Sequence, residues 1–210
     1  MKKLKKITTL KKLNPTVTMI KQAINLFIFL EAYLANKLPI KSFQVLKDEI
    51  ILVIEPQKIN LIINFLRYHL NSRFEILACI SGTDYPERLD RFEISYELLS
   101  VQYNVRIRLK TYVNEKTCLS STCNVFSSAN WYEREIFDLL GVSFFNHVDL
   151  RRILTDYGFE DFPLRKDFPL SGFVEVRFDE KKKRVVCESI EYSQQFRHFN
   201  FESPWVKSLT

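Results

Sequence analysis

The chain has 210 residues, 46% of them hydrophobic, and this content excludes disorder over most of its length. Its formal net charge is +6, but the chain is neutral once the lysines at its start are set aside. A nucleic-acid-binding protein needs a basic stripe across its folded surface, so this distribution argues against that class. The six charges lie on Lys2, Lys3, Lys5, Lys6, Lys11 and Lys12.

The lysine-rich start, residues 1–14, is predicted to be a solvated basic arm, with a membrane-surface contact or a targeting signal as alternatives. It has no Arg and only two hydroxyl residues before Leu10, whereas transit peptides are typically rich in both. The longest apolar stretch, Ala23–Leu30, is too short to cross a bilayer, which needs about 20 apolar residues. We therefore expect any membrane association to be indirect.

Four cysteines and three histidines are scattered along the chain, and the closest cysteine pair is Cys118 and Cys123. Zinc and iron–sulfur sites usually show tighter cysteine pairs, with further ligands at defined spacing. We expect no metal site, and thiols that stay reduced in an intracellular or matrix compartment. The remaining members of this set are Cys79, Cys187, His69, His147 and His198.

The first predicted elements are a helix, a hairpin and a second helix. Apolar residues at helical spacing predict an amphipathic helix from Met19 to Leu38. Phe43–Leu46 and Ile50–Ile54 are predicted strands of a hairpin. Pro56 suits the first turn of the second helix, and an apolar stripe follows it. The stripe consists of Ile59, Ile62, Ile63, Leu66 and Leu70.

Three further strands and a short helix are predicted next, and the last two strands alternate polar and apolar residues. This order indicates an α+β domain over residues 15–145, with a mainly antiparallel sheet packed with helices. The strands are Phe74–Ser81, Phe92–Leu98 and Val105–Val113, and the helix is Trp131–Leu140.

Glycine is rare in this chain, which has only four. Each is therefore expected to occupy a position that requires a positive φ or a close approach of the backbone. Gly141 directly follows a helical run and suits a C′ cap. The others are Gly82, Gly158 and Gly172.

From residue 146 to residue 210 the periodicity fades, and we predict an irregular C-terminal extension that wraps around a partner. The block 146–170 interleaves three Arg, one Lys and five acids with large apolar side chains. Arg and aromatic residues commonly anchor protein interfaces. Packing of this block on its own domain is the alternative, and the chemistry of the block does not decide between them.

The run DLRRILTDYGF and the later run PLRKDFPLSG closely resemble the signature of the peripheral-arm 30-kDa subunit family of respiratory complex I (NADH:ubiquinone oxidoreductase). The family has bacterial members, and those that mitochondria encode are called NADH dehydrogenase subunit 9. The resemblance extends in the same order from about Phe74 to Trp205. Further matching stretches are Gly82–Tyr85, Arg91–Glu93, Tyr96–Ser100, Trp131–Gly141, Val174–Asp179, Phe196–Phe199 and Phe201–Trp205.

The chain departs from the family pattern at two places. The family usually has Pro where this chain has Val148, and Gly-His where it has Asp161-Phe162. Loss of a Pro and a Gly changes the conformational constraints on the local backbone, while the flanking motifs are intact.

The resemblance implies a structural and assembly subunit of NADH:ubiquinone reductase (H+-translocating), with no catalytic residue, cofactor or metal ion of its own. FMN, iron–sulfur clusters and ubiquinone would lie elsewhere in the complex. The implied partners are other peripheral-arm subunits, chiefly the large quinone-site subunit and neighbouring iron–sulfur subunits, and not a second copy of this chain. The implied place is the matrix side of the mitochondrial inner membrane, or the cytoplasmic side of a bacterial inner membrane.

We predict that the partner interface uses charged and aromatic side chains of the last predicted helix, the 146–170 block and the tail. These residues are Arg134, Glu135, His147, Asp149, Arg151, Arg152, Asp156, Tyr157, Phe159, Arg165, Lys166, Asp167, Phe168, Arg177 and Trp205. On the helix, Trp131, Glu135 and Asp138 share a face, which we interpret as its polar face.

Other chemistries and function classes are weaker alternatives. His147 beside Asp149 resembles a catalytic base with its orienting acid, but a hydrogen-bonded structural role is the preferred interpretation. No GxGxxG, P-loop or flavin fingerprint occurs in the sequence. The alternative functions are the equivalent subunit of a membrane-bound hydrogenase or plastid-type dehydrogenase, and an RNA-binding module.

Overall fold

The computed structural model describes residues 38–46 and 49–201. The predicted basic arm (1–14), the helix predicted over residues 19–38 (apart from Leu38) and Trp205 lie outside these ranges. The chain divides into two compact units, with the boundary between Phe168 and Pro169. The first unit therefore includes residues 146–168, which the sequence pattern assigns to the extension.

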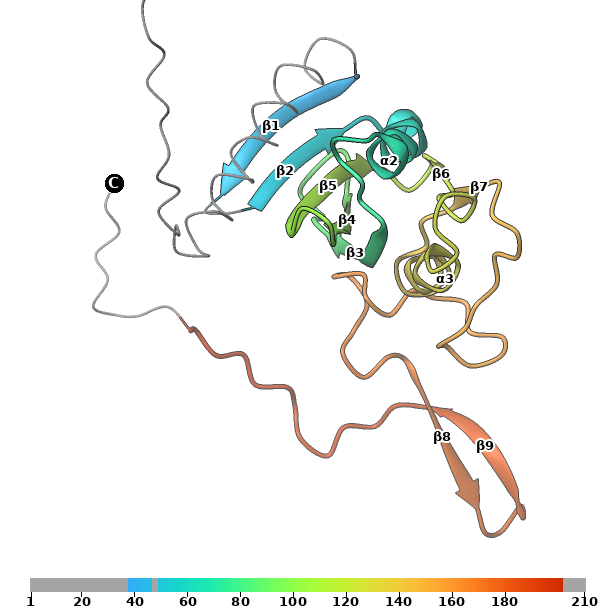
Figure 1. Cartoon of the computed structure of the whole chain (residues 1–210). Helices are drawn as coiled ribbons and strands as arrows, with labels where there is room; N and C mark the ends of the chain where they lie inside the picture. Colours follow the sequence, from blue (N-terminus) through green and yellow to red (C-terminus); the bar gives the residue numbers. More distant parts are fainter. Residues whose placement is uncertain (1–37, 47–48, 202–210) are drawn as a thin grey trace, which may run out of the picture. The chain divides into compact units, whose positions relative to one another are not determined.

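The first unit contains a five-stranded sheet in the order β1-β2-β5-β4-β3 (Figure 1). Its pairings are antiparallel except that of β2 with β5, which is parallel, so the prediction of a mainly antiparallel sheet is confirmed. The parallel pair arises because a helix and two strands intervene between its members. The strands are β1 (Ile40–Leu46), β2 (Glu49–Ile54), β3 (Ile76–Asp84), β4 (Phe92–Ser100) and β5 (Val105–Val113).

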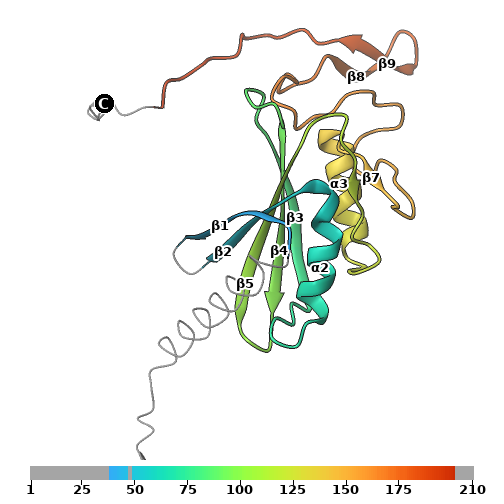
Figure 2. The ribbon, with the colours of Figure 1, turned by 90° about the horizontal axis from the view of Figure 1, so that it is seen from above.

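Two helices, α2 (Ile59–Tyr68) and α3 (Ala129–Leu140), lie on the same face of this sheet (Figures 1 and 2). A short 3₁₀ turn, η1 (Pro56–Lys58), precedes α2, because Pro56 can begin a helix but cannot donate a backbone hydrogen bond. Four members of the predicted apolar stripe, Ile59, Ile62, Ile63 and Leu66, are buried on α2. The prediction is wrong for Leu70, which lies beyond the end of the helix and is exposed. The four buried residues pack in one core with the inward side chains of β4 and β5, which include Ile94, Tyr96, Leu98, Ile107 and Leu109.

Two glycines determine how closely α3 packs on the sheet and where the helix ends. A Cβ added at Gly82 in β3 would clash with Cδ1 of Leu140, so α3 approaches the sheet more closely than a side chain would permit. Gly141 ends α3 with φ 82°, and its N–H donates to the Phe137 carbonyl at 3.0 Å. Both findings confirm the predicted roles of these glycines.

A small parallel pair, β6 (Leu119–Ser120) with β7 (Phe144–Phe145), flanks α3 and is not among the predicted elements. Strands of two residues show no periodicity, so the sequence carries no signal for them. Among the described residues, no helix is both long enough and apolar enough to cross a membrane.

The second unit contains a two-stranded antiparallel hairpin, β8 (Val174–Asp179) with β9 (Arg184–Ser189). The turn lies between these strands, in a region where Lys183 has φ 51°. The prediction of an irregular extension is wrong for this hairpin. Each strand has only six residues, and the charged and aromatic residues around them obscure the short alternation that would predict a strand. Residues 146–173 contain no helix or strand.

Candidate functional site

Residues 146–168, here called the strap, run alongside α3 in the same direction as the helix (Figures 1 and 2). At the start of α3, His147 Nε2 lies 3.3 Å from the Asn130 carbonyl oxygen. At the end of α3, the Leu164 N–H donates to the Leu139 carbonyl at 3.0 Å. The strap therefore follows the helix over its whole length and belongs to the first unit.

Asp138 is the central anchor of the strap. Its Oδ2 accepts hydrogen bonds from three consecutive backbone N–H groups, those of Ile153 (3.0 Å), Leu154 (2.6 Å) and Thr155 (3.0 Å). Its Oδ1 accepts from the Thr155 hydroxyl at 2.5 Å and from Arg152 Nη1 at 3.3 Å. Backbone N–H groups in a segment without helix or strand lack the usual carbonyl partners, and here one carboxylate accepts hydrogen bonds from three of them.

The prediction that Asp138 lies on a polar face of α3 is wrong, because the strap covers its side chain completely. Burial raises the pKa of Asp138, but the hydrogen bonds from the Thr155 hydroxyl and the three backbone N–H groups outweigh that effect. Together they hold the pKa at about 2. The carboxylate is therefore ionised under ordinary conditions, and it is stabilised by its own chain. Trp131 and Glu135, on the same side of the helix, are exposed as predicted.

Phe162 lies between two arginines of the strap. The guanidinium carbon of Arg165 lies 4.4 Å from the ring centroid, and that of Arg152 lies 5.1 Å from it. Arg165 also donates from Nε to the Leu140 carbonyl at 2.8 Å, which helps to satisfy the end of α3. The departure from the family pattern at Phe162 therefore adds a stacked aromatic side chain at the C-terminus of α3.

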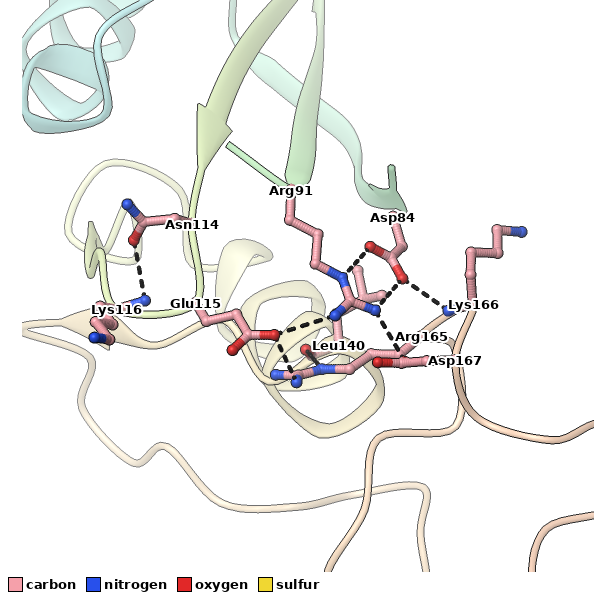
Figure 3. Close-up of polar contacts among 9 residues, drawn as sticks. All are labelled: Asp84, Arg91, Asn114, Glu115, Lys116, Leu140, Arg165, Lys166 and Asp167. Atoms are coloured by element: carbon pink, nitrogen blue, oxygen red, sulfur yellow. Dashed lines mark hydrogen bonds and ion pairs between the residues drawn. The ribbon is translucent and has the colours of Figure 1, made fainter. Parts of the chain in front are cut away.

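A second anchor joins the end of the strap to the sheet at Asp84 and Arg91 (Figure 3). Arg91 makes a two-pronged contact with the buried Asp84 carboxylate, Nε to Oδ1 at 2.6 Å and Nη2 to Oδ2 at 2.8 Å. The Lys166 N–H donates to Asp84 Oδ2 at 2.7 Å, and Arg91 Nη2 reaches Asp167 Oδ1 at 2.9 Å. Glu115 then bridges Arg91 (3.2 Å) and Arg165 (3.1 Å).

The electrostatics of this second anchor favour the charged forms. The hydrogen bonds from Arg91 lower the pKa of Asp84 despite its burial, and the Lys166 N–H adds to the effect. The same contacts, first with Asp84 and then with Asp167, raise the pKa of Arg91. Strands β3 and β4 and the strap are thus joined by paired charges.

Cys123, Glu133 and His147 form the one group of three possible metal ligands found within the described ranges. Their ligand atoms all lie within 4.8 Å of one another. Zinc accepts all three ligand types, but each ligand must offer the metal a lone pair that carries no proton.

The hydrogen bonding around this group does not fit a metal ion. The Asp149 N–H donates to His147 Nδ1 at 3.1 Å, so the proton of the neutral ring lies on Nε2, the atom nearest Glu133. Metal-binding histidines instead use their second nitrogen as a donor. Both oxygens of Glu133 already accept hydrogen bonds from this chain, and one of the donors is the Cys123 thiol itself. The group is therefore a buried Glu133 carboxylate that accepts hydrogen bonds from the residues around it, with Cys123 and His147 beside it.

The predicted interface residues fall into two groups. Arg134 is buried, and the side chains of His147, Arg152 and Arg165 are largely covered and bonded within the chain. Phe159 and Phe168 are half-buried, and their ring centroids lie 6.0 Å apart. The exposed members are Glu135, Asp149, Arg151, Asp156, Tyr157, Lys166 and Asp167 in the first unit and Arg177 in the second; Trp205 lies outside the described residues.

Reasoning from the sequence does not single out Asp84 and Arg91 as site residues, and it places Asp138 on the wrong face. Asp84 and Arg91 occur in stretches that match the family signature, at facing ends of a strand pair. A charged residue at the end of each paired strand is a weak signal for an ion pair across a turn. The partners of Asp138 lie at least 14 residues away along the chain and have no local signal.

Comparison with known proteins gives one family. The model of "Respiratory-chain NADH dehydrogenase, 30 Kd subunit" matches residues 52–174, more than half of the chain. A protein of Prototheca wickerhamii called NADH-ubiquinone oxidoreductase subunit 9 is 55% identical over 159 residues, which are 76% of this chain and 83% of the relative. NADH dehydrogenase [ubiquinone] iron-sulfur protein 3 of Beta trigyna is 61% identical over 141 residues, 67% of this chain and 73% of the relative.

Among solved structures, a chain of the membrane-bound sulfane sulfur reductase, an archaeal respiratory membrane complex, has a similar fold. The TM-score is 0.60, and the match covers 77% of this chain and 99% of that chain. The sequence identity is 22%, so the similarity concerns the fold alone.

Proposed function

Because the chain belongs to the 30-kDa subunit family of respiratory-chain NADH dehydrogenase, we propose that it acts as a non-catalytic scaffold in the peripheral arm of respiratory complex I. The complex is an NADH:ubiquinone oxidoreductase, and the chain is one of its peripheral-arm subunits. In the proposed role the chain holds the large quinone-site subunit in place beside neighbouring iron–sulfur subunits. It thereby supports electron transfer to ubiquinone that is coupled to proton translocation.

The observation that carries the scaffold role is that buried carboxylates of the first unit are bonded to their own chain. Both oxygens of Asp84, Glu133 and Asp138 accept hydrogen bonds from residues of this unit. A general acid or base must instead reach a proton on a substrate. Asp138 and Asp84 order the strap against α3 and the sheet, and Glu133 orders residues 121–123 against α3, which suits a subunit that presents a surface.

Exposed apolar side chains support contacts with other proteins. Tyr157 in the strap is fully exposed, and Val174, Val176 and Phe178 are exposed on one face of β8. A two-stranded hairpin is marginally stable by itself, so this one is expected to be covered in the assembled complex. We propose that the strap and the hairpin are both contact surfaces for neighbouring subunits.

We propose that the chain binds no redox cofactor, and that FMN, iron–sulfur clusters and ubiquinone lie on other subunits. The name of the Beta trigyna relative includes the term iron-sulfur protein, so the cysteines of this chain bear on the question. All four lie in the described ranges, and no group of possible ligands there contains more than one of them. A protein-bound cluster of the common types takes several cysteine ligands.

We place the chain at the matrix side of the mitochondrial inner membrane, as a peripheral subunit held by its partners. The support is that the relatives named above, from Prototheca wickerhamii and Beta trigyna, carry the mitochondrial-type names subunit 9 and iron-sulfur protein 3. A bacterial location, at the cytoplasmic side of the inner membrane, is the alternative. The equivalent subunit of a hydrogenase or plastid-type dehydrogenase is not favoured, because NADH–ubiquinone subunits share 55% and 61% identity with this chain.

Purification of the native complex tests the proposal. The chain is expected to co-purify with NADH:ubiquinone reductase activity, at one copy for each copy of the other subunits. The isolated chain is expected to oxidise no NADH and to bind no flavin. Stoichiometric iron in the isolated chain after anaerobic purification would contradict the scaffold role. Absence of the chain from the active complex would contradict membership of the peripheral arm.

A further inference from the structure

We infer that the exposed side of the strap is an acidic and aromatic docking surface for a basic surface of a neighbouring protein subunit. The inference rests on the proposed scaffold function and adds the chemistry of one of its partners. It follows from which charges the strap turns inward and which it leaves in solvent.

The strap contains basic and acidic residues, but the fold separates them. The side chains of Arg152 and Arg165 are 26% and 19% exposed, because they are stacked on Phe162 and bonded to the chain. Every carboxylate residue of the strap is exposed, and only two basic residues are. The acids are Asp149, Asp156, Glu160, Asp161 and Asp167, and the bases are Arg151 and Lys166.

Two of the five acids are neutralised within the chain. Asp149 pairs with Arg151 at 2.9 Å, and Asp167 pairs with Arg91 at 2.9 Å. In the part of the chain that the structure describes, the other three carboxylates make no ion pair. These unpaired acids are Asp156, Glu160 and Asp161.

The unpaired acids lie close together near the C-terminal end of α3. Arg152 donates from Nη1 to the Asp161 carbonyl at 3.0 Å, which fixes the backbone there against the Asp138 anchor. Asp156 directly follows Thr155, whose N–H and hydroxyl bind the same anchor. The negative charge is therefore concentrated on a segment whose backbone is already ordered, which lowers the entropic cost of docking.

Large apolar side chains adjoin this charge. Leu154 and Tyr157 are exposed beside the acids, and Val148 and Trp131 are exposed further toward the start of α3. Aromatic anchors ringed by polar groups are typical of protein–protein interfaces. Phosphate backbones and anionic lipid headgroups would be repelled, so the complementary occupant is a protein surface with Lys or Arg around an apolar pocket.

Carboxylate labelling tests the inference on the native complex and on the isolated full-length chain. Carbodiimide with glycine ethyl ester is expected to modify Glu160 and Asp161 in the isolated chain, and about tenfold less in the complex. Equal modification in both would overturn the docking surface. The proposed function is judged separately, by whether the chain is present in the complex at all.

Carbodiimide without added amine identifies the occupant of the surface. Cross-links from Asp156, Glu160 or Asp161 to lysines of another subunit are expected. Cross-links to the lysines of residues 1–14 of this chain alone would overturn the inference, because the surface would then be covered by the chain itself.

A charge-reversal pair gives the matched control. Glu160→Lys with Asp161→Lys is expected to lower incorporation into the complex by about tenfold relative to wild type, since like charges then face each other. Glu55→Lys with Glu75→Lys makes the same change in charge at two other exposed positions of the first unit and is expected to incorporate normally. Both double variants should unfold at the same temperature as the wild-type chain. An equal loss of incorporation in the two double variants would overturn the inference that the strap is the docking surface.

Discussion

Both carboxylate oxygens of Asp138 are bonded to one residue, Thr155: Oδ1 accepts from its hydroxyl at 2.5 Å and Oδ2 from its N–H at 3.0 Å. The relationship joins a helix to a segment without secondary structure over 17 positions of sequence. It makes the order of residues 153–155 of the strap depend on the ionisation of one side chain.

Asp138→Asn is expected to lower the free energy of unfolding of the first unit by roughly 2 kcal/mol. The substitution replaces one carboxylate oxygen by an NH₂ group, which cannot accept and instead points a donor at the N–H or O–H groups that donate to Asp138. In the wild-type chain, the folded-state pKa of about 2 lies below the ordinary value of 3.8. This contribution is therefore fully present above about pH 4 and is lost as the pH falls toward 2. Urea unfolding between pH 2 and pH 7 measures it.

The control for this prediction is Glu135→Gln, an exposed position one turn earlier on α3. It should leave the free energy of unfolding and its dependence on acid pH almost unchanged. An Asp138→Asn chain with wild-type stability at pH 7 would contradict the anchoring role.

Arg91→Ala is expected to cost about 3 kcal/mol, because it leaves the buried Asp84 carboxylate without its charged partner. Loss of the partner should also expose the strap near Asp167 to protease. Arg177→Ala removes the exposed ion pair of Arg177 with Glu188 in the hairpin, and it should leave thermal stability almost unchanged, because solvent screens exposed ion pairs. Thermal unfolding and limited proteolysis compare the two, and equal effects would contradict the prediction.

Gly141→Ala should be more damaging than Gly158→Ala, although both glycines have positive φ, 82° and 77°. A Cβ at Gly141 would lie 2.6 Å from Arg165 Nη2 and 2.8 Å from Cζ of Phe162, whereas nothing lies within 4 Å of one at Gly158. The backbone penalty of roughly 1–2 kcal/mol is common to both. Denaturant midpoints should therefore separate them, and coincident midpoints would show that the strap does not press on Gly141.

Cys123 should react with iodoacetamide much more slowly than Cys118 and Cys187 at pH 8. Burial raises the pKa of Cys123 to about 11, so little thiolate is present, and its thiol donates to Glu133. Cys118 and Cys187 are exposed. Peptide mass spectrometry over time gives the order of modification, and early loss of Cys123 would contradict the buried group of Cys123, Glu133 and His147.

The sheet and its helices can be predicted because their signals are local. Strict alternation predicts Val105–Val113 at both ends, and the apolar stripe predicts α2. The partners of Asp138 and Asp84 cannot be predicted, because the strap has no periodicity and its contacts join residues far apart in sequence. The arginines of the strap show the limit most clearly, since composition does not say whether Arg152 faces its own chain or another.

The parallel pairing of β2 with β5 bears on how the chain folds. β3, β4 and β5 follow one another along the chain and pair in sequence order, so their contacts form early at a small loop-closure cost. β2 is synthesised before all three, yet it can join the sheet only once β5 exists to receive it. Its buried residues, such as Leu52 and Ile54, stay uncovered through that interval. β1 and β2 are therefore expected to dock after the three strands that follow them along the chain, and the nascent chain is expected to be most prone to aggregation during this delay.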